Sequence, residues 1–128
     1  MVVVDTSALI DALIGGPYDQ LRERLAAEPE YAVPELTDLE FHEALRGLVR
    51  SRAVQPERAE TAREDYGMMT LDRFPHTPFL DRVWELRGQL TAYDACYVAL
   101  AEALEIPLVT TDRRLARSKG HRAEIELY

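Results

Sequence analysis

Four acidic residues stand at positions where a folded chain could use them for chemistry. Two of them follow short apolar runs typical of buried strands: Asp5 comes after three valines, and Asp112 comes after Leu-Val-Thr-Thr. The other two, Glu40 and Asp94, stand near the starts of expected helices. In an open α/β sheet, ligands bind beyond the carboxyl ends of the strands, where the following helices begin. We therefore expect these carboxylates to gather at one rim of the domain.

Each acid also has a purely structural explanation. The Thr-x-x-Glu pattern ending at Glu40 and the Thr-x-x-Asp pattern ending at Asp94 both resemble capping boxes. The two acids that follow strands lie where helix capping and the helix dipole favour a negative charge. After Asp5, either Thr6 or Ser7 is placed to cap the next helix. For any one acid alone, capping is the better explanation.

The helix that begins near Asp94 and the strand that precedes Asp112 have similar expected lengths. The two acids should therefore lie at the same end of the domain. A helix from Tyr93 to Glu105 runs about 18 Å at 1.5 Å per residue. The following strand, Pro107 to Thr111, returns about 16 Å at 3.3 Å per residue. Because Asp94 and Asp112 are then expected to lie close together, a shared chemical role becomes a better explanation for them than helix capping.

Carboxylates gathered at one rim repel one another, and hard divalent cations are their natural neutralisers. Oxygen ligands without cysteine or paired histidine favour Mg²⁺ or Mn²⁺ over Zn²⁺. Such a site can activate a bound water for attack on a phosphodiester and stabilise charge on the leaving oxygen. No side-chain nucleophile is then required.

Short apolar runs alternate with helical patterns along the chain, which predicts βαβ units and an α/β fold with a mainly parallel sheet. No linker, repeat or low-complexity stretch interrupts the 128 residues, so we expect a single domain over residues 1–128. The expected helices cover residues 7–13, 18–27, 36–52, 56–65, 79–90, 91–104 and a turn at 113–117. The expected strands cover residues 2–4, 31–33, 68–74, 107–111 and 125–128. Tyr97 and Cys96 are predicted to lie in the core, and Trp84 is predicted to be partly buried.

Composition narrows the classes of protein. The net charge of −8 argues against unspecific binding of a polyanion over the whole surface. The apolar runs are too short for a bilayer span, and the single cysteine excludes a disulfide framework, so we expect a cytoplasmic protein without a membrane partner. A local basic segment nevertheless follows Asp112, and within it Arg113 and Arg114 are candidates for contact with RNA phosphate.

The motifs around the acids resemble those of PIN domains, and specifically of the short VapC-type toxin ribonucleases. The opening Val-Asp-Thr-Ser-Ala-Leu around Asp5, the Tyr-Asp-Ala around Asp94 and the Leu-Val-Thr-Thr-Asp-Arg-Arg-Leu around Asp112 match the first, third and last motifs of the family. The segment from Pro34 to Glu40 fits the looser second motif. The match extends over the whole chain.

This resemblance implies a three-layer PIN-like fold and a metal-dependent endoribonuclease whose catalytic and metal-binding acids are Asp5, Glu40, Asp94 and Asp112. It implies that Ser7 and Thr110 orient carboxylates or waters. It also implies a homodimer that is silenced by a cognate antitoxin covering the active-site groove. Glu43, three residues after Glu40, remains the rival for the second acid.

Other classes remain open. A phosphatase of the haloacid dehalogenase type also begins with a strand and an aspartate, but it needs a second aspartate where Ser7 stands. A phospho-receiver domain needs a lysine at the end of a strand, and the only lysine is Lys119 in the C-terminal segment. A PIN-like RNA-processing nuclease outside a toxin–antitoxin pair and a catalytically silent PIN-like binding module are further alternatives.

Overall fold

The computed structural model describes the whole chain, residues 1–128, around a sheet of five parallel strands in the order β3-β2-β1-β4-β5. The strands are β1 (Val2–Val4), β2 (Tyr31–Pro34), β3 (Leu71–Phe74), β4 (Leu108–Thr110) and β5 (Ile125–Leu127). The first strand lies in the middle, with Val3 paired to Ala32 of β2 on one side and to Leu108 of β4 on the other. The predicted parallel α/β fold is confirmed.

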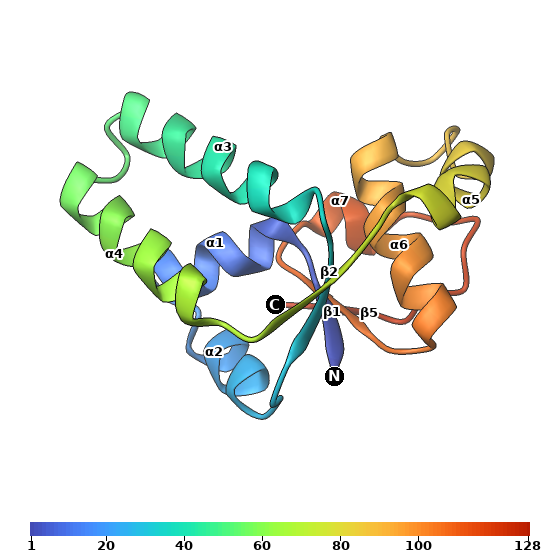
Figure 1. Cartoon of the computed structure of the whole chain (residues 1–128), viewed down its shortest axis with the longest axis horizontal. Helices are drawn as coiled ribbons and strands as arrows, with labels where there is room; N and C mark the ends of the chain where they lie inside the picture. The colour runs from blue at the N-terminus through green and yellow to red at the C-terminus, as the bar shows by residue number, and fades with distance from the viewer.

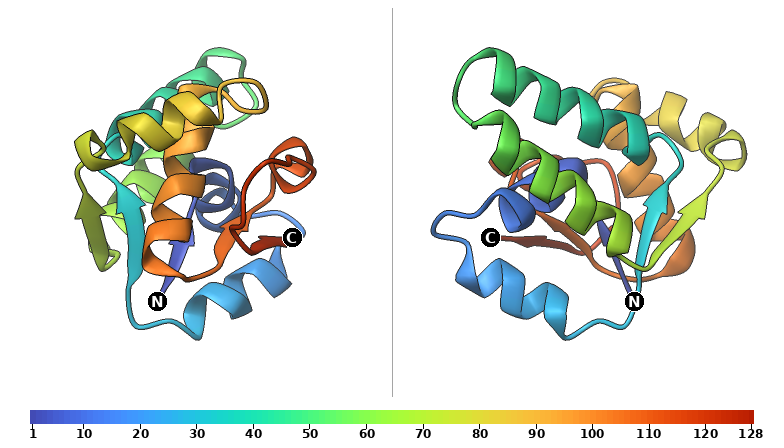
Figure 2. Two further views of the ribbon diagram at one scale, coloured as in Figure 1. Left: turned by 90° about the vertical axis from the view of Figure 1, so that its right-hand side faces the viewer. Right: turned by 60° about the vertical axis from the view of Figure 1, so that its left-hand side comes forward.

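Helices cover both faces of the sheet and form three layers (Figure 1). One face carries α1 (Thr6–Ile14), α2 (Asp19–Ala26), α3 (Thr37–Arg50) and α4 (Pro56–Met68). The other face carries the short 3₁₀ turn η1 (Thr77–Phe79), α5 (Leu80–Glu85), α6 (Ala92–Leu104) and α7 (Arg113–Ala116). Figure 2 shows the fold from two further sides, with α3 and α4 running side by side as they do in Figure 1.

The alternation of side chains in β1 divides the core between these two layers. Val2 and Val4 pack with Leu9 and Phe41 on the α1–α4 side, whereas Val3 packs on the α5–α7 side. All three valines are at most 1% exposed, and burying each side chain contributes about 1.5–3 kcal/mol. The strand that carries Asp5 is therefore held rigidly from both faces.

The helix expected over residues 79–90, and the burial of Trp84 within it, differ from the sequence prediction. The helix expected over residues 79–90 ends at Glu85, because the chain turns at Leu86, which is buried, ahead of the weak helix former Gly88. Trp84 is 68% exposed, so its predicted partial burial is wrong. The guanidinium of Arg87 lies 4.6 Å from the centre of its ring, and this contact replaces packing in the core.

A polar anchor fixes the first turn of α3. Arg73 of the edge strand β3 donates hydrogen bonds to both carboxylate oxygens of Asp38, at 2.8 and 3.0 Å, and Tyr66 of α4 donates a third at 2.6 Å. The bonds from Arg73 hold the pKa of Asp38 below its usual value. Asp38 precedes Glu40 by two residues, so this anchor orients the turn that carries the second acid.

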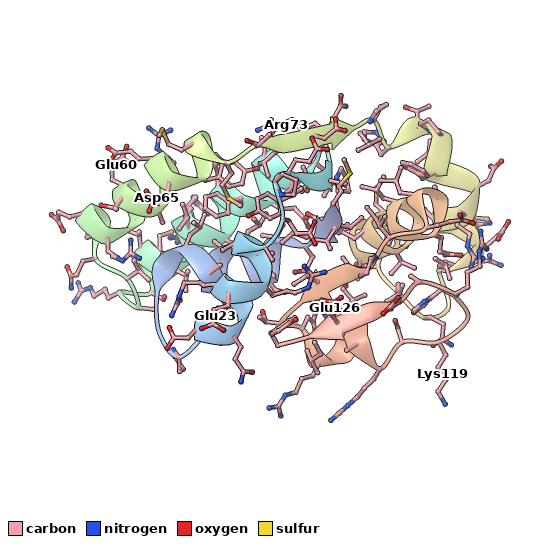
Figure 3. The ribbon with its side chains drawn as sticks, turned by 90° about the horizontal axis from the view of Figure 1, so that it is seen from below. Glu23, Glu60, Asp65, Arg73, Lys119 and Glu126 are labelled. Atoms are coloured by element: carbon pink, nitrogen blue, oxygen red, sulfur yellow. The ribbon has the colours of Figure 1, made fainter.

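Charged side chains elsewhere on the surface point into solvent. Figure 3 shows Lys119 extending away from the C-terminal segment, and Glu60 and Asp65 on the outer side of α4. Glu60 makes only a surface ion pair with Arg63. No helix is both long and apolar enough to span a lipid bilayer.

Candidate active site

The starts of α1, α3, α6 and α7 meet at the edge of the sheet where β1, β2 and β4 end (Figure 1). The first acid at this edge is Asp5, which β1 delivers. It is itself the N-cap of α1, because its Oδ1 accepts a hydrogen bond of 2.9 Å from the backbone N–H of Ala8. The expectation that Thr6 or Ser7 would cap this helix is wrong, because the helix already begins at Thr6.

Asp5 is a buried carboxylate without a cationic partner. It is 5% exposed, and its hydrogen bonds come only from Ser7, Ala8 and Thr110. Burial raises its pKa to about 6, against the effect of these hydrogen bonds, and the charge of Asp94 contributes to this rise. A buried charge of this kind normally needs a counterion.

Ser7 and Thr110 hold both oxygens of that carboxylate. The Ser7 hydroxyl donates to Oδ1 at 2.7 Å, and the Thr110 hydroxyl donates to Oδ2. Thr110 also accepts a hydrogen bond of 3.0 Å from the backbone N–H of Asp112. One hydroxyl on β4 therefore connects the first acid to the last.

Asp94 and Asp112 face each other across the starts of α6 and α7. The Nη2 of Arg114 lies 3.9 Å from Oδ2 of Asp94 and 3.5 Å from Oδ2 of Asp112. Burial raises the pKa of Asp94, and the negative charge of Asp112 adds to the effect. Asp112 also caps α7, since its Oδ1 accepts from the backbone N–H groups of Arg114 and Leu115.

Glu40 enters the site from the first turns of α3. Its Oε1 accepts hydrogen bonds from the Thr6 hydroxyl at 3.1 Å and from the Tyr97 phenol at 2.7 Å. Glu43, by contrast, is 71% exposed and pairs with Arg46 at 3.0 Å. The contacts of the two glutamates favour Glu40 as the member of the site.

The capping-box interpretation is wrong for the turn that carries Glu40. Thr37 lies inside α3 rather than ahead of it, and its buried hydroxyl contacts the Tyr97 phenol at 2.7 Å. At the start of α6, by contrast, Thr91 does cap the helix by accepting from the backbone N–H of Asp94. The reciprocal bond of a capping box, from the backbone N–H of Thr91 to the Asp94 carboxylate, is absent.

The four acids share one edge but do not converge on a single point. No group of three or more acidic, histidine or cysteine side chains lies close enough together to coordinate an ion as it stands. The donor set still fits a hard divalent cation, because all four groups are carboxylates and the buried one lacks a counterion.

Sequence reasoning missed Tyr97 and Asp11. The predicted place of Tyr97 in the core is confirmed, since it is 1% exposed, but the sequence did not predict that its hydroxyl contacts Thr6, Thr37 and Glu40. The sequence does place Tyr97 one helical turn after Asp94, so both side chains point towards the same edge of the sheet. This spacing could have indicated that the Tyr97 hydroxyl lies near the site. Nothing in the sequence marked Asp11, whose partner lies 100 positions along the chain.

Asp11 tethers the loop that carries the last acid. Its Oδ2 accepts a hydrogen bond of 2.6 Å from the hydroxyl of Thr111, the residue before Asp112. We expect Thr111→Val to slow cleavage of RNA about tenfold, because Asp112 loses a support behind it. Thr111→Ser keeps the hydroxyl and should remain close to wild type. Cleavage rates and thermal unfolding of the two variants check this, and equal rates for Val and Ser would contradict it.

Comparison with known proteins places this geometry in a family. The model of the PIN domain matches residues 2–120. Ribonuclease VapC1 of Mycobacterium tuberculosis is 41% identical over 127 residues, which cover 98% of this chain and 96% of the relative.

Solved structures agree. The crystal structure of PAE2754 from Pyrobaculum aerophilum is 28% identical and superposes with a TM-score of 0.68, covering 97% of this chain and 82% of that one. A toxin–antitoxin complex from Klebsiella pneumoniae, 21% identical, shares the fold with a TM-score of 0.65 over 91% of this chain and 92% of that one. The chain thus belongs to the PIN-domain family and, within it, to the VapC ribonucleases.

Proposed function

We propose that this protein is an endoribonuclease toxin that hydrolyses RNA phosphodiester bonds with the help of divalent metal ions. Residues 1–128 act as one nuclease domain, and the acids at its site are Asp5, Glu40, Asp94 and Asp112. The observation that carries the proposal is the buried Asp5 carboxylate, which has no cationic partner and lies at the same edge as Asp94 and Asp112. Its kinship with ribonucleases supports the choice of RNA.

Mg²⁺ or Mn²⁺ is the proposed cofactor, because carboxylate oxygens without sulfur or imidazole ligands suit these ions. When bound, such an ion supplies an activated water and stabilises charge on the leaving oxygen. The chain's own contribution is to hold the acids in place. Ser7 and Thr110 fix Asp5 by hydrogen bonds, and Thr6 and Tyr97 fix Glu40.

The RNA backbone is proposed to contact α7. Arg113 is exposed and makes no ion pair, so it is available to a phosphate. Arg114 is 80% exposed and already lies beside Asp94 and Asp112, where the scissile phosphate must come. Positive charges beside the acids offset their repulsion of a polyanion.

A cognate antitoxin is the proposed regulator, supported by the structural likeness to a chain solved within a toxin–antitoxin complex. A homodimer is the proposed assembly, and it would cover exposed apolar side chains such as Leu80 and Trp84 of α5. The cytoplasm, where RNA and antitoxin are made, is the proposed location.

Cleavage assays with and without chelator test the function. We expect the purified protein to cut single-stranded RNA in Mg²⁺ or Mn²⁺, to stop in EDTA and to recover when the ion is restored, because the carboxylates alone cannot activate water. A catalytically silent binding module would retain RNA without cutting it. Full cleavage activity in excess EDTA would contradict the metal-dependent mechanism.

A further inference from the structure

Tyr97 joins three helices at one buried hydroxyl. Its phenol oxygen lies 2.9 Å from the hydroxyl of Thr6 in α1, 2.7 Å from the hydroxyl of Thr37 in α3 and 2.7 Å from Oε1 of Glu40. The Tyr97 side chain is 1% exposed. Tyr93, one turn earlier in the same helix, is 62% exposed and makes none of these contacts.

The direction of these hydrogen bonds follows from counting hydrogens. An ionised carboxylate only accepts, so the phenol of Tyr97 donates its single hydrogen to Glu40. Thr37 then donates to the phenol oxygen, and the single hydroxyl hydrogen of Thr6 is within reach of two acceptors, the phenol oxygen at 2.9 Å and Oε1 of Glu40 at 3.1 Å. Oε1 of Glu40 therefore has two hydroxyl donors within hydrogen-bond distance, whereas Oε2 has none.

Asp112 repeats this division between its two oxygens. Its Oδ1 is taken by the backbone N–H groups of Arg114 and Leu115, and its Oδ2 has only the side chain of Arg114 at 3.5 Å. Like Glu40, Asp112 thus keeps one oxygen engaged behind it and leaves the other towards the site. The carboxylates of Glu40 and Asp112 are therefore each arranged to offer one oxygen to a cation.

The number of oxygens that each carboxylate offers bears on the choice of cation. Ca²⁺ takes six to eight oxygen ligands and readily accepts both oxygens of one carboxylate. Mg²⁺ demands near-ideal octahedral geometry, keeps several waters and binds through one or two carboxylates. A glutamate whose Oε1 is held by two donors is poorly suited to binding through both oxygens.

We propose that Tyr97 is a positioning residue that sets the metal preference of the site: it engages Oε1 of Glu40 and so disfavours Ca²⁺ relative to Mg²⁺ and Mn²⁺. This inference rests on the proposed metal-dependent function. Without the phenol hydroxyl, Oε1 loses its shorter hydrogen bond and becomes available to a cation together with Oε2.

The test compares Tyr97→Phe with the matched control Tyr93→Phe on the same helix. Mn²⁺ is bound to the RNA-free protein, Ca²⁺ is added, and electron paramagnetic resonance measures the Mn²⁺ released. In Tyr97→Phe we expect the ratio of Mn²⁺ to Ca²⁺ affinity to fall about tenfold, the low end of the range for partners of metal ligands. Tyr93→Phe should keep the wild-type ratio.

Thr6→Val removes the second donor to Oε1, so it should shift the ratio in the same direction, and it replaces Tyr97→Phe if that variant does not fold. If a folded variant still binds Mn²⁺ with the wild-type ratio of Mn²⁺ to Ca²⁺ affinity, the inference about Tyr97 is overturned, and the proposed metal dependence is not affected. An equal loss of both ions also overturns this inference, because Tyr97 would then hold Glu40 without choosing between cations. A wild-type protein that binds neither ion overturns the proposed metal dependence, and this inference with it.

Discussion

Asp5→Asn is expected to abolish RNA cleavage and, at the same time, to stabilise the metal-free protein above pH 6. Asparagine caps a helix about as well as aspartate, so α1 should keep its start. Its amide carbonyl can still accept from Ser7 and Ala8, and Thr110 can turn its hydroxyl to accept from the amide nitrogen. The substitution removes the negative charge of Asp5. The proposed chemistry needs this charge, but the stability of the metal-free protein does not.

The pH dependence follows from the direction of the pKa shift. Burial raises the pKa of Asp5 from 3.8 to about 6 in the folded protein, so the folded state favours the protonated carboxyl. This contribution to stability is complete below pH 4 and is lost as the pH rises through 6. The change from 3.8 to about 6 corresponds to about 3 kcal/mol, the upper limit of what Asp5→Asn can restore at pH 8.

Thermal unfolding in EDTA at pH 4 and pH 8 measures this effect. Asp5→Asn should melt above wild type at pH 8, and the difference should shrink at pH 4, where the wild-type carboxyl is protonated. Cleavage assays on the same samples test the second part of the prediction, the loss of RNA cleavage. If Asp5 were only a helix cap, the variant would remain fully active, and that result would remove the central acid from the site.

Glu40→Gln is expected to reduce cleavage about a hundredfold, the upper end of the range for mutated partners of metal ligands. The Thr6 hydroxyl and the Tyr97 phenol both donate to Oε1, so the glutamine must place its carbonyl oxygen there. Its NH₂ group then takes the position of Oε2. A hydrogen-bond donor thus faces the place where a cation would bind, while the contacts behind it survive.

Glu43→Gln provides the matched control, since it makes the same change three residues along the same helix. Glu43 is 71% exposed and pairs with Arg46 on the surface, where such pairs contribute little. We expect this variant to keep the wild-type rate and melting temperature. Comparable losses in both variants would show that the charge of α3 matters in general, and the assignment of Glu40 to the site would then fail.

The arrangement of the acids could be predicted because parallel topology constrains it. Once short apolar runs alternate with helices, Asp5 and Asp112 must follow strands at the same edge of the sheet. Asp94 arrives there because its helix and the next strand have matching lengths. None of these steps requires knowledge of an individual side-chain contact.

The contacts that support the acids could not be predicted in the same way. Thr37 fits a capping box by local pattern, but its hydroxyl bonds to Tyr97, which lies 60 positions away along the chain. Trp84 has the spacing of a buried residue, but it lies on the exposed side of α5, where the guanidinium of Arg87 packs over its ring. Local patterns report the hydrophobic face of a helix, whereas pairing of polar groups across elements depends on the tertiary structure.

The central position of β1 also bears on when the protein becomes active during its own synthesis. The hydroxyl that holds Oδ2 of Asp5 belongs to Thr110, which is synthesised 105 positions after Asp5. The strand that carries Asp5 likewise gains its second neighbour only when β4 is made. A nascent chain on a ribosome therefore holds an incomplete site until β4 has been made and has emerged. Before that point, a nuclease under synthesis lacks the complete site with which it could attack the RNA of the ribosome.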